Sequence, residues 1–191
     1  GDVVENTKVL FLKKIESEDA IVTYQYNGNK ISEIASEIYD LDEIITGKGV
    51  YTYEGDLIVK QESFNKEGSS TFKQEYFYEN NKLKTYYFVD GEYIRKTTYV
   101  HKNDGTVSFN LYKVDSKTMT ETYLESGVYT FLEGNLVKYE NSKVITVYEH
   151  DDKKNHSKNI LGINKLIGET ANQNNVLKET ITHKDSGISS I

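Results

Sequence analysis

The stretch YFYENNKLKTYY, residues 76–87, places aromatic side chains at every second position, breaks at Asn80-Asn81 and then resumes with more Tyr. Side chains two residues apart on a β-strand point to the same face, so Tyr76 and Tyr78 would lie side by side on one face of a sheet. Asn tolerates the positive φ that tight hairpin turns require. The stretch therefore predicts a β-hairpin whose turn is Asn80-Asn81.

Related versions of this phrase recur along the chain. They are YQYNGNKI (24–31), YTYEGDLI (51–58), YFYENNKL (76–83), YVHKNDGTV (99–107), YTFLEGNL (129–136), YEHDDKKN (148–155) and ITHKDSGI (181–188). The units start roughly every 26 residues, a period typical of a unit that stacks beside copies of itself. Turn-forming pairs stand at matching places in several units: Asn27-Gly28, Asp104-Gly105 and Gly134-Asn135. Each unit is therefore expected to be a hairpin.

A chain of 191 residues has the length of one domain, and we expect residues 1–191 to form a single unit. Consecutive hairpins predict an all-β fold: an antiparallel meander of about a dozen strands, bent into a curved sheet or a partly closed barrel. Only 37% of the residues are hydrophobic, whereas 16 are Tyr. Much of the buried apolar area must therefore come from Tyr rings, whose hydroxyl groups need polar partners.

Two segments depart from the hairpin pattern. The apolar residues at 31, 34, 38, 41 and 45 have a helical spacing, which predicts a turn or short helix over 36–45 after a strand that begins at Asn29. Residues 157–168 predict a second, clearer helix, with Ser157 as its cap and Gly168 at its end. Residues 170–176 indicate a loop, and residues 1–6 a solvated end.

The charge balance argues against nucleic-acid binding. The net charge is −7, and Arg95 is the one arginine of the sequence, whereas phosphate binding requires clustered Lys and Arg. The sequence contains no Cys, which excludes disulfides and thiolate metal sites. No run of 18 apolar residues is present, so no transmembrane helix is expected.

The series of Tyr-x-Tyr hairpin units, closed by YEHDDKKNHSKNILGINKL (148–166), resembles a family of Bacteroidetes (Flavobacterium-type) exported proteins of unknown function, usually predicted to be lipoproteins. The likeness covers about residues 8 to 191. Its most specific part is Asp151 to Leu166, where His156 stands in place of the usual Pro. The hairpin phrase more distantly resembles the YD repeats of Rhs-type secreted proteins.

This resemblance implies a porin-like or half-barrel curved sheet in a soluble exported protein. It also implies a lipid anchor upstream of Gly1 and a place in the periplasm, at the outer membrane or on the cell surface. The resemblance transfers no catalytic residue.

The histidines and acidic residues offer two weak candidates for a metal site. His101, His150 and His183 occupy the second aromatic position of their units, which favours a role as polar aromatic residues on a strand face. His150 together with Asp151, Asp152 and His156 could supply nitrogen and oxygen ligands, although all four are also common turn residues. An acidic cluster could bind Ca²⁺ but lacks the spacing of a calcium loop; its members are Glu37, Asp40, Asp42 and Glu43.

The Tyr residues are the best functional candidates. If one sheet face stays uncovered, a strip of rings could bind a glycan or a peptide; its members are Tyr24, Tyr26, Tyr51, Tyr53, Tyr76, Tyr78 and Tyr99. The competing interpretation is that these rings are simply the core, packed on each other or on residues 157–168.

Three classes of function follow from these patterns. We expect a non-enzymatic module that binds a ligand or acts as a scaffold. The alternative is an assembly protein that pairs through a sheet edge. A glycoside hydrolase is less favoured, because no catalytic motif occurs and two catalytic carboxylates cannot be selected from 30 acidic residues by sequence.

Overall fold

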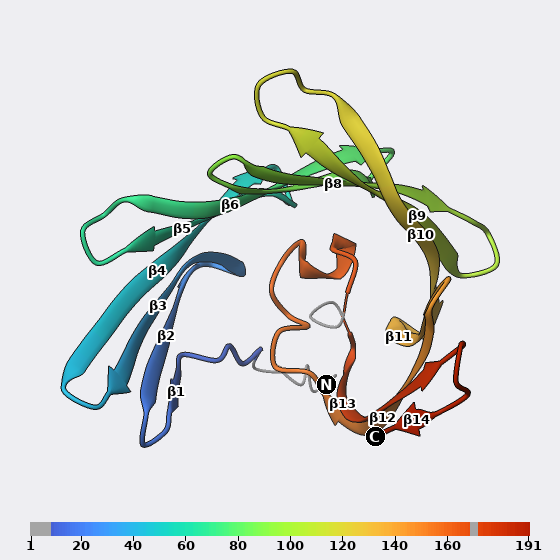
Figure 1. Cartoon of the computed structure of the whole chain (residues 1–191). Coiled ribbons are helices and arrows are strands. Elements are labelled where there is room, and N and C mark those ends of the chain that lie inside the picture. The colour runs from blue at the N-terminus through green and yellow to red at the C-terminus, as the bar shows by residue number, and fades with distance from the viewer. Residues whose placement is uncertain (1–8, 169–171) are drawn as a thin grey trace.

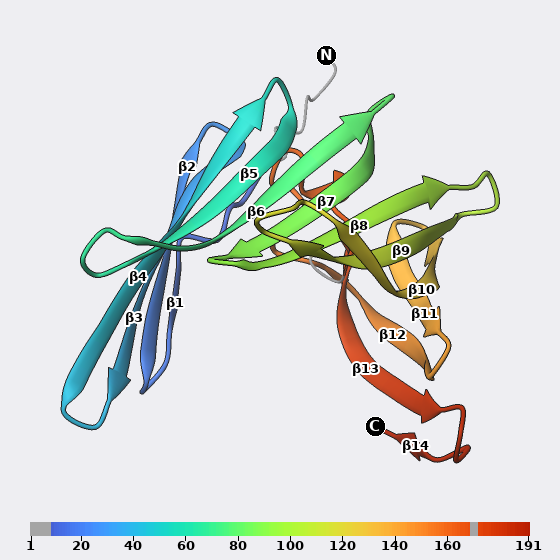
Figure 2. The same cartoon turned by 45° about the horizontal axis from the view of Figure 1, so that its top comes forward.

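The computed structural model describes residues 9–168 and 172–191. Its described residues form one open antiparallel sheet in which every strand pairs with its neighbours in sequence. The sheet curves into a trough, with β2–β5 on one side and β9–β13 on the other (Figures 1 and 2). The strands are β1 Lys14–Glu16, β2 Ala20–Asn27, β3 Lys30–Asp40, β4 Glu43–Glu54, β5 Leu57–Asn65, β6 Ser70–Glu79, β7 Lys82–Asp90, β8 Tyr93–His101, β9 Thr106–Asp115, β10 Glu121–Leu132, β11 Asn135–Asn141, β12 Val144–Lys154, β13 Asn174–His183 and β14 Ser189–Ser190. The predicted all-β meander is confirmed, as a curved and open sheet.

The turns follow the chemistry of their residues. Asn80 and Asn81 form the two-residue loop between β6 and β7 with φ of 51° and 60°. Both lie in the left-handed region that favours Asn and Gly and that matches the twist of paired strands. The β10–β11 turn is shifted by one residue from the prediction. Glu133 and Gly134 form it, because Asn135 already pairs with Leu132.

The sixth unit, residues 148–155, does not form a hairpin. Strand β12 continues through Tyr148 to Lys154, with register shifts on both sides of His150 against β13. After Lys154 the chain leaves the sheet and enters the trough (Figure 1). It returns as β13 from Asn174, so the loop predicted over 170–176 is wrong from residue 174 onward, and its first two residues lie outside the described part of the chain. The solvated end predicted for residues 1–6 lies outside the described residues.

The turn or short helix predicted over 36–45 is wrong. Strands β3 and β4 pair continuously up to Asp40 and Glu43. A β-bulge caused the misleading spacing: Tyr26 pairs with Ile31, but Gln25 pairs with Glu33, so Ser32 is an extra residue. Because of this extra residue, two side chains that are three positions apart point to the same face of the strand. Ile31 and Ile34 therefore both face into the trough, where they contact one apolar cluster.

Residues 155–168, here called the inner segment, lie inside the trough (Figure 1). The predicted helix over 157–168 is wrong: the segment contains a single 3₁₀ turn, η1 Ile163–Lys165. Successive turns with hydrogen bonds over three residues replace the helix, and the backbone of Leu161 bonds the sheet. The Leu161 N–H donates to the Asn29 carbonyl at 2.8 Å, and the Leu161 carbonyl accepts from the Tyr53 hydroxyl at 2.9 Å. Gly162, with φ of 81°, turns the chain directly after these contacts.

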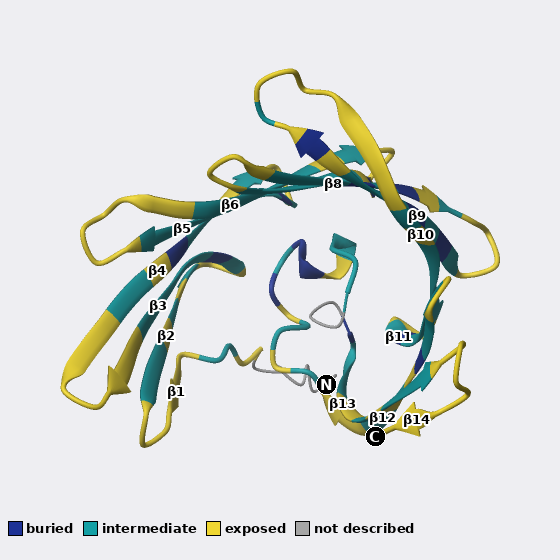
Figure 3. Cartoon of the chain, in the orientation of Figure 1, coloured by how far each residue is buried: buried dark blue, intermediate teal, exposed yellow. Residues whose placement is uncertain are grey.

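The core lies between the sheet and the inner segment. The last apolar residue of each of the first five units forms a row along the concave face, with exposed fractions of 0–6%: Ile31, Ile58, Leu83, Val107 and Leu136. Ile160 and Ile163 of the inner segment pack on Ile31 and Ile58. Figure 3 shows this buried centre and the exposed hairpin ends around it.

Candidate binding site on the concave face

The concave face consists of regular rows because the hairpins share one register. The first aromatic residue of each unit pairs directly with a residue of the second strand: Tyr24 with Ile34, Tyr51 with Gln61, Tyr76 with Tyr86, Tyr99 with Phe109, and Tyr129 with Tyr139. The second aromatic position pairs with the buried row in the same way, for example Tyr78 with Leu83. Directly opposed side chains are the closest neighbours across two strands. Along β6–β11 the first row therefore becomes almost entirely aromatic.

The second aromatic position connects neighbouring hairpins. Tyr78 donates from its hydroxyl to the Ile58 carbonyl of the preceding unit at 2.7 Å. The hydroxyl of Tyr53 accepts from the Ile31 N–H at 3.2 Å. His101 contacts the Leu83 carbonyl through Nε2 at 2.7 Å, so this nitrogen carries the proton. In these units the position uses an aromatic residue with a polar end, which accounts for His101 in the place of Tyr, whereas the fifth unit has Phe131 there.

The predicted Tyr strip lies on one face and is largely part of the core. Tyr24, Tyr26, Tyr51 and Tyr53 pack against the cluster of Ile31, Ile58, Ile160 and Ile163. Tyr78 packs against a second cluster, which includes Leu83 and Tyr99. Tyr76 packs against both clusters, and together with Tyr99 it also lines a cavity of about 320 Å³.

This cavity, here called the aromatic cavity, lies between the sheet and the end of the inner segment. Leu166 and Ile167 form its wall on the inner segment, and Leu83 and Leu111 contribute on the sheet. Each of the six consecutive strands β6–β11 contributes one ring: Tyr76, Tyr86, Tyr99, Phe109, Tyr129 and Tyr139. Its volume is within the range of sites that hold small ligands.

Polar side chains stand on two sides of these rings. Gln74 accepts from the Tyr86 hydroxyl at 2.8 Å, and its amide group donates to Gln61. Across the cavity, Asn141 donates to Glu125 at 3.2 Å and to the Tyr139 hydroxyl at 3.0 Å. Gln74, Thr97 and Glu125 line the cavity itself. The site therefore combines ring faces with amide, hydroxyl and carboxylate groups.

The hydroxyl groups around this cavity remain protonated at neutral pH. Burial raises the pKa of Tyr86 to about 12, and burial together with the neighbouring Tyr139 phenol raises the pKa of Tyr129 to about 12. Burial also raises the pKa of Tyr76 and of Tyr99 well above the usual value of tyrosine. A protonated phenol is both a hydrogen-bond donor and an acceptor.

Sequence reasoning missed several residues of this site. Tyr86 and Tyr139 stand three residues after the buried Leu83 and Leu136, and a bulge in each hairpin places them on the concave face. The matching position of both Tyr residues relative to the unit's last apolar residue is a signal that the sequence does contain. Glu125 and Gln74 have no comparable signal, because they precede their units by different distances.

The two candidate metal sites are not assembled. In residues 9–168 and 172–191 no group of three His, Asp or Glu side chains is arranged to hold a metal ion. Asp151 accepts hydrogen bonds from Lys153 and Asn175, and is thus a structural acceptor between β12 and β13. Of the acidic cluster, Asp40 and Glu43 flank the β3–β4 turn, while Glu37 accepts from the Tyr39 hydroxyl.

A scan against protein-family models finds no match, and a search of curated proteins finds no similar sequence. The resemblance to the Bacteroidetes family therefore stays a prediction. Within the described part of the chain, no helix has the length and apolar character to cross a membrane.

Proposed function

We propose that this protein binds a neutral glycan in the aromatic cavity without transforming it. The observation that carries the proposal is the combination, in one cavity of about 320 Å³, of six aromatic rings with Gln74, Thr97 and Glu125. Ring faces match the C–H faces of pyranoses, whereas amide, hydroxyl and carboxylate groups match sugar hydroxyls, which both donate and accept. A site that pairs polar groups with ring faces is selective for such ligands.

The single carboxyl group among the described lining residues of the cavity favours binding of a sugar over its hydrolysis. Among its described lining residues, Glu125 alone carries a carboxyl group. Most glycoside hydrolases require two carboxyl groups on opposite sides of the bond that they cleave. A single carboxylate, already hydrogen-bonded to Asn141, is better suited to orient a sugar hydroxyl.

Peptide binding and assembly through a sheet edge receive less support than glycan binding. A peptide ligand commonly adds a strand to a free sheet edge, but the aromatic cavity lies on a sheet face. Assembly through an edge would use β1 or β14, which contain 3 and 2 residues. Edge strands that short offer few backbone groups for pairing.

The family resemblance supports one further part of the proposal, a place in the cell envelope. A glycan-binding module at the periplasm, outer membrane or cell surface would meet polysaccharides there. Cell fractionation of the native host, with antibodies against this chain, tests the location; recovery from the cytosol alone would contradict it.

Titration with neutral oligosaccharides tests the binding proposal. Because the chain contains 16 Tyr and no Trp, Tyr fluorescence reports directly on the rings, and calorimetry gives the affinity. We expect saturable binding of one sugar class. Glu125→Gln should weaken binding about tenfold, the effect of losing one charge-assisted hydrogen bond.

The matched control is Glu18→Gln, which changes an exposed carboxylate between β1 and β2 and should bind as the parent does. Absence of saturable binding across the panel, or equal affinities of the parent and Glu125→Gln, would contradict the proposal.

A further inference from the structure

A second cavity of about 320 Å³ lies beside the aromatic cavity and shares Leu83, Leu166 and Ile167 with it. It opens near the hairpin ends, between the β6–β7 and β10–β11 turns and the inner segment. We call it the basic cavity, because its polar lining differs in charge from the rest of the molecule.

The basic cavity is lined by two lysines in a chain of net charge −7. Lys82 comes from the start of β7 and Lys165 from η1. Asp and Glu are absent from its described lining residues, and neither lysine nitrogen is within 4.0 Å of a described carboxylate. Two ammonium groups beside one cavity repel each other unless an anion lies between them.

Three side-chain amides add further donors: Asn81, Asn164 and Gln173. Gln173 is held in place by its backbone, whose N–H donates to the Gly134 carbonyl at 3.2 Å. A Cβ atom on Gly134 would stand 2.5 Å from the Gln173 side chain, so Gly134 makes room for it. The neighbouring Asn172 is buried and accepts from the Leu136 N–H at 2.6 Å, which fixes the same stretch to β11.

The remaining wall is apolar, formed by Leu83, Val107, Phe131 and Leu166. A cavity with cations and amides on one part and carbon on the other suits an amphipathic anion. We infer that the basic cavity binds the oxyanion of a small organic acid or ester, a carboxylate, sulfate or phosphate, between Lys82 and Lys165. The carbon skeleton of the ligand then contacts Leu83, Val107 and Phe131. This site is independent of neutral-glycan binding in the aromatic cavity.

Calorimetric and ¹H–¹⁵N NMR titrations at constant ionic strength test this inference. The probes are sodium sulfate, sodium phosphate and sodium glucuronate, with glucose as the neutral control and chloride as the balancing anion. We expect at least one oxyanion to shift the amide signals of Asn81, Lys82, Asn164 and Gln173 in a saturable way, and glucose to leave them unchanged. The double variant Lys82→Gln/Lys165→Gln should lose affinity by about tenfold or more.

Lys66→Gln, at an exposed lysine in the β5–β6 turn, is the matched control and should bind as the parent does. Binding of glucuronate alone would identify an acidic sugar as the source of the oxyanion, and binding of sulfate or phosphate would identify a tetrahedral ester group. No saturable shift with any oxyanion, or undiminished affinity in the double variant, would overturn the inference. If the double variant unfolds, Lys82→Gln alone, at an exposed position, decides the matter in the same way.

Discussion

The Tyr78 hydroxyl donates to the backbone carbonyl of Ile58 in the preceding hairpin, over 2.7 Å. Ile58 lies at a bulge, since Tyr53 pairs with Ile58 but Thr52 pairs with Lys60. A bulge leaves backbone groups without a partner in the ladder. The second aromatic of one unit therefore satisfies a backbone group that the previous unit leaves free, and the repeat in the sequence reflects this dependence between neighbours.

Replacement of Tyr78 by Phe tests the hydrogen bond between the two neighbouring hairpins. The variant keeps the ring but leaves the Ile58 carbonyl without its donor, so the free energy of unfolding should fall by about 1–3 kcal/mol. Urea unfolding followed by circular dichroism measures the change. Tyr123→Phe is the control, because its hydroxyl bonds Ser126 on the exposed surface and should cost less than about 0.5 kcal/mol. An equal loss of unfolding free energy in both variants would contradict a stabilising role of the Tyr78–Ile58 hydrogen bond.

These bulges also explain how far the sequence could predict the fold. Alternating aromatics and positive-φ turn residues are local signals, and they correctly indicated the meander. An extra residue after Ile31 or Leu83 breaks the period of two, which produced a false helical pattern in one hairpin and concealed Tyr86 in another. The helix expected over 157–168 does not form, and the backbone of Leu161 bonds Asn29 and Tyr53 instead, the latter 108 positions away in the sequence.

The candidate site was only partly predictable for the same reason. Tyr76 and Tyr99 were recognised from their repeat, yet which rings face a cavity depends on where the inner segment lies. Ile160 and Ile163 pack closely on one half of the Tyr row, whereas Leu166 and Ile167 leave a cavity between themselves and the other half. No local pattern encodes that placement, because the apolar side chains of residues 160–167 would suit a helix equally well.

Gly162→Ala should loosen the inner segment from the sheet. Gly162 has φ of 81°, and an added Cβ would lie 2.8 Å from the Asp56 carbonyl oxygen. The free energy of unfolding should fall by about 2–4 kcal/mol, from backbone strain plus the clash. Hydrogen exchange should rise at the amides of Leu161 and Leu166.

Gly68→Ala is the matched control for that variant. Gly68 has φ of 80°, but a Cβ there would meet open space. Its cost should be backbone strain alone, about 1 kcal/mol. If both variants lost the same stability, the close contact between the inner segment and Asp56 would be refuted.

Alkaline pH should destabilise the fold in a defined window. Burial raises the pKa of Tyr51, Tyr86 and Tyr129 to about 12, whereas an unfolded tyrosine ionises near pH 10. The unfolded chain therefore loses protons first, so this stabilisation is complete below pH 10 and is lost as the pH rises from 10 to 12. The melting temperature should fall over that window, and Tyr129→Phe should make the slope shallower. An unchanged slope in Tyr129→Phe would contradict the burial of that phenol.

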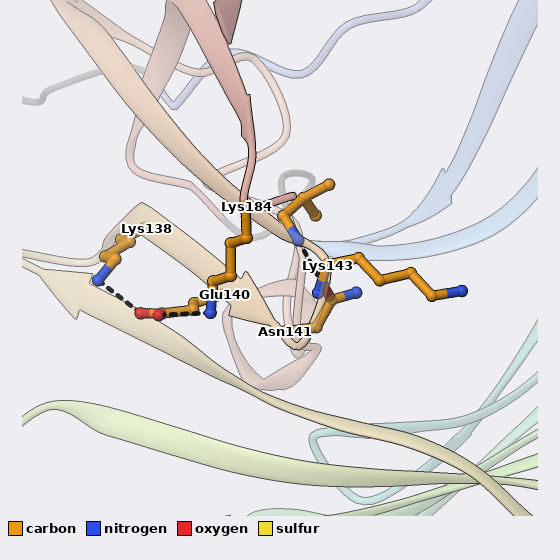
Figure 4. A network of polar contacts seen from close by, with 6 residues as sticks. Lys138, Glu140, Asn141, Lys143 and Lys184 are labelled. Atoms are coloured by element: carbon orange, nitrogen blue, oxygen red, sulfur yellow. Dashed lines mark hydrogen bonds and ion pairs between the residues drawn. The ribbon is translucent and has the colours of Figure 1, made fainter. Parts of the chain in front are cut away.

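Glu140 joins β11 to the turn between β13 and β14. Its carboxylate lies 2.6 Å from the Lys138 ammonium and 2.9 Å from that of Lys184, as Figure 4 shows. The Lys184 N–H also donates to the Lys143 carbonyl at 2.8 Å, which keeps the turn beside β11. Hydrogen bonds from Lys138 and Lys184 lower the pKa of Glu140 to about 2.

NMR titration of the Glu140 side-chain carboxyl should therefore find a pKa well below 4.5 at low ionic strength. Because the pKa is depressed in the folded state, the pair stabilises the fold above pH 4.5 and ceases to do so as the pH falls toward 2. Lys184→Gln should raise the pKa of Glu140, and added salt should raise it in the parent, since the pair is exposed to solvent. Lys143→Gln is the control, since its side chain makes no ion pair with a described carboxylate. An ordinary glutamate pKa in the parent would show that the last hairpin is not held against β11 by this pair.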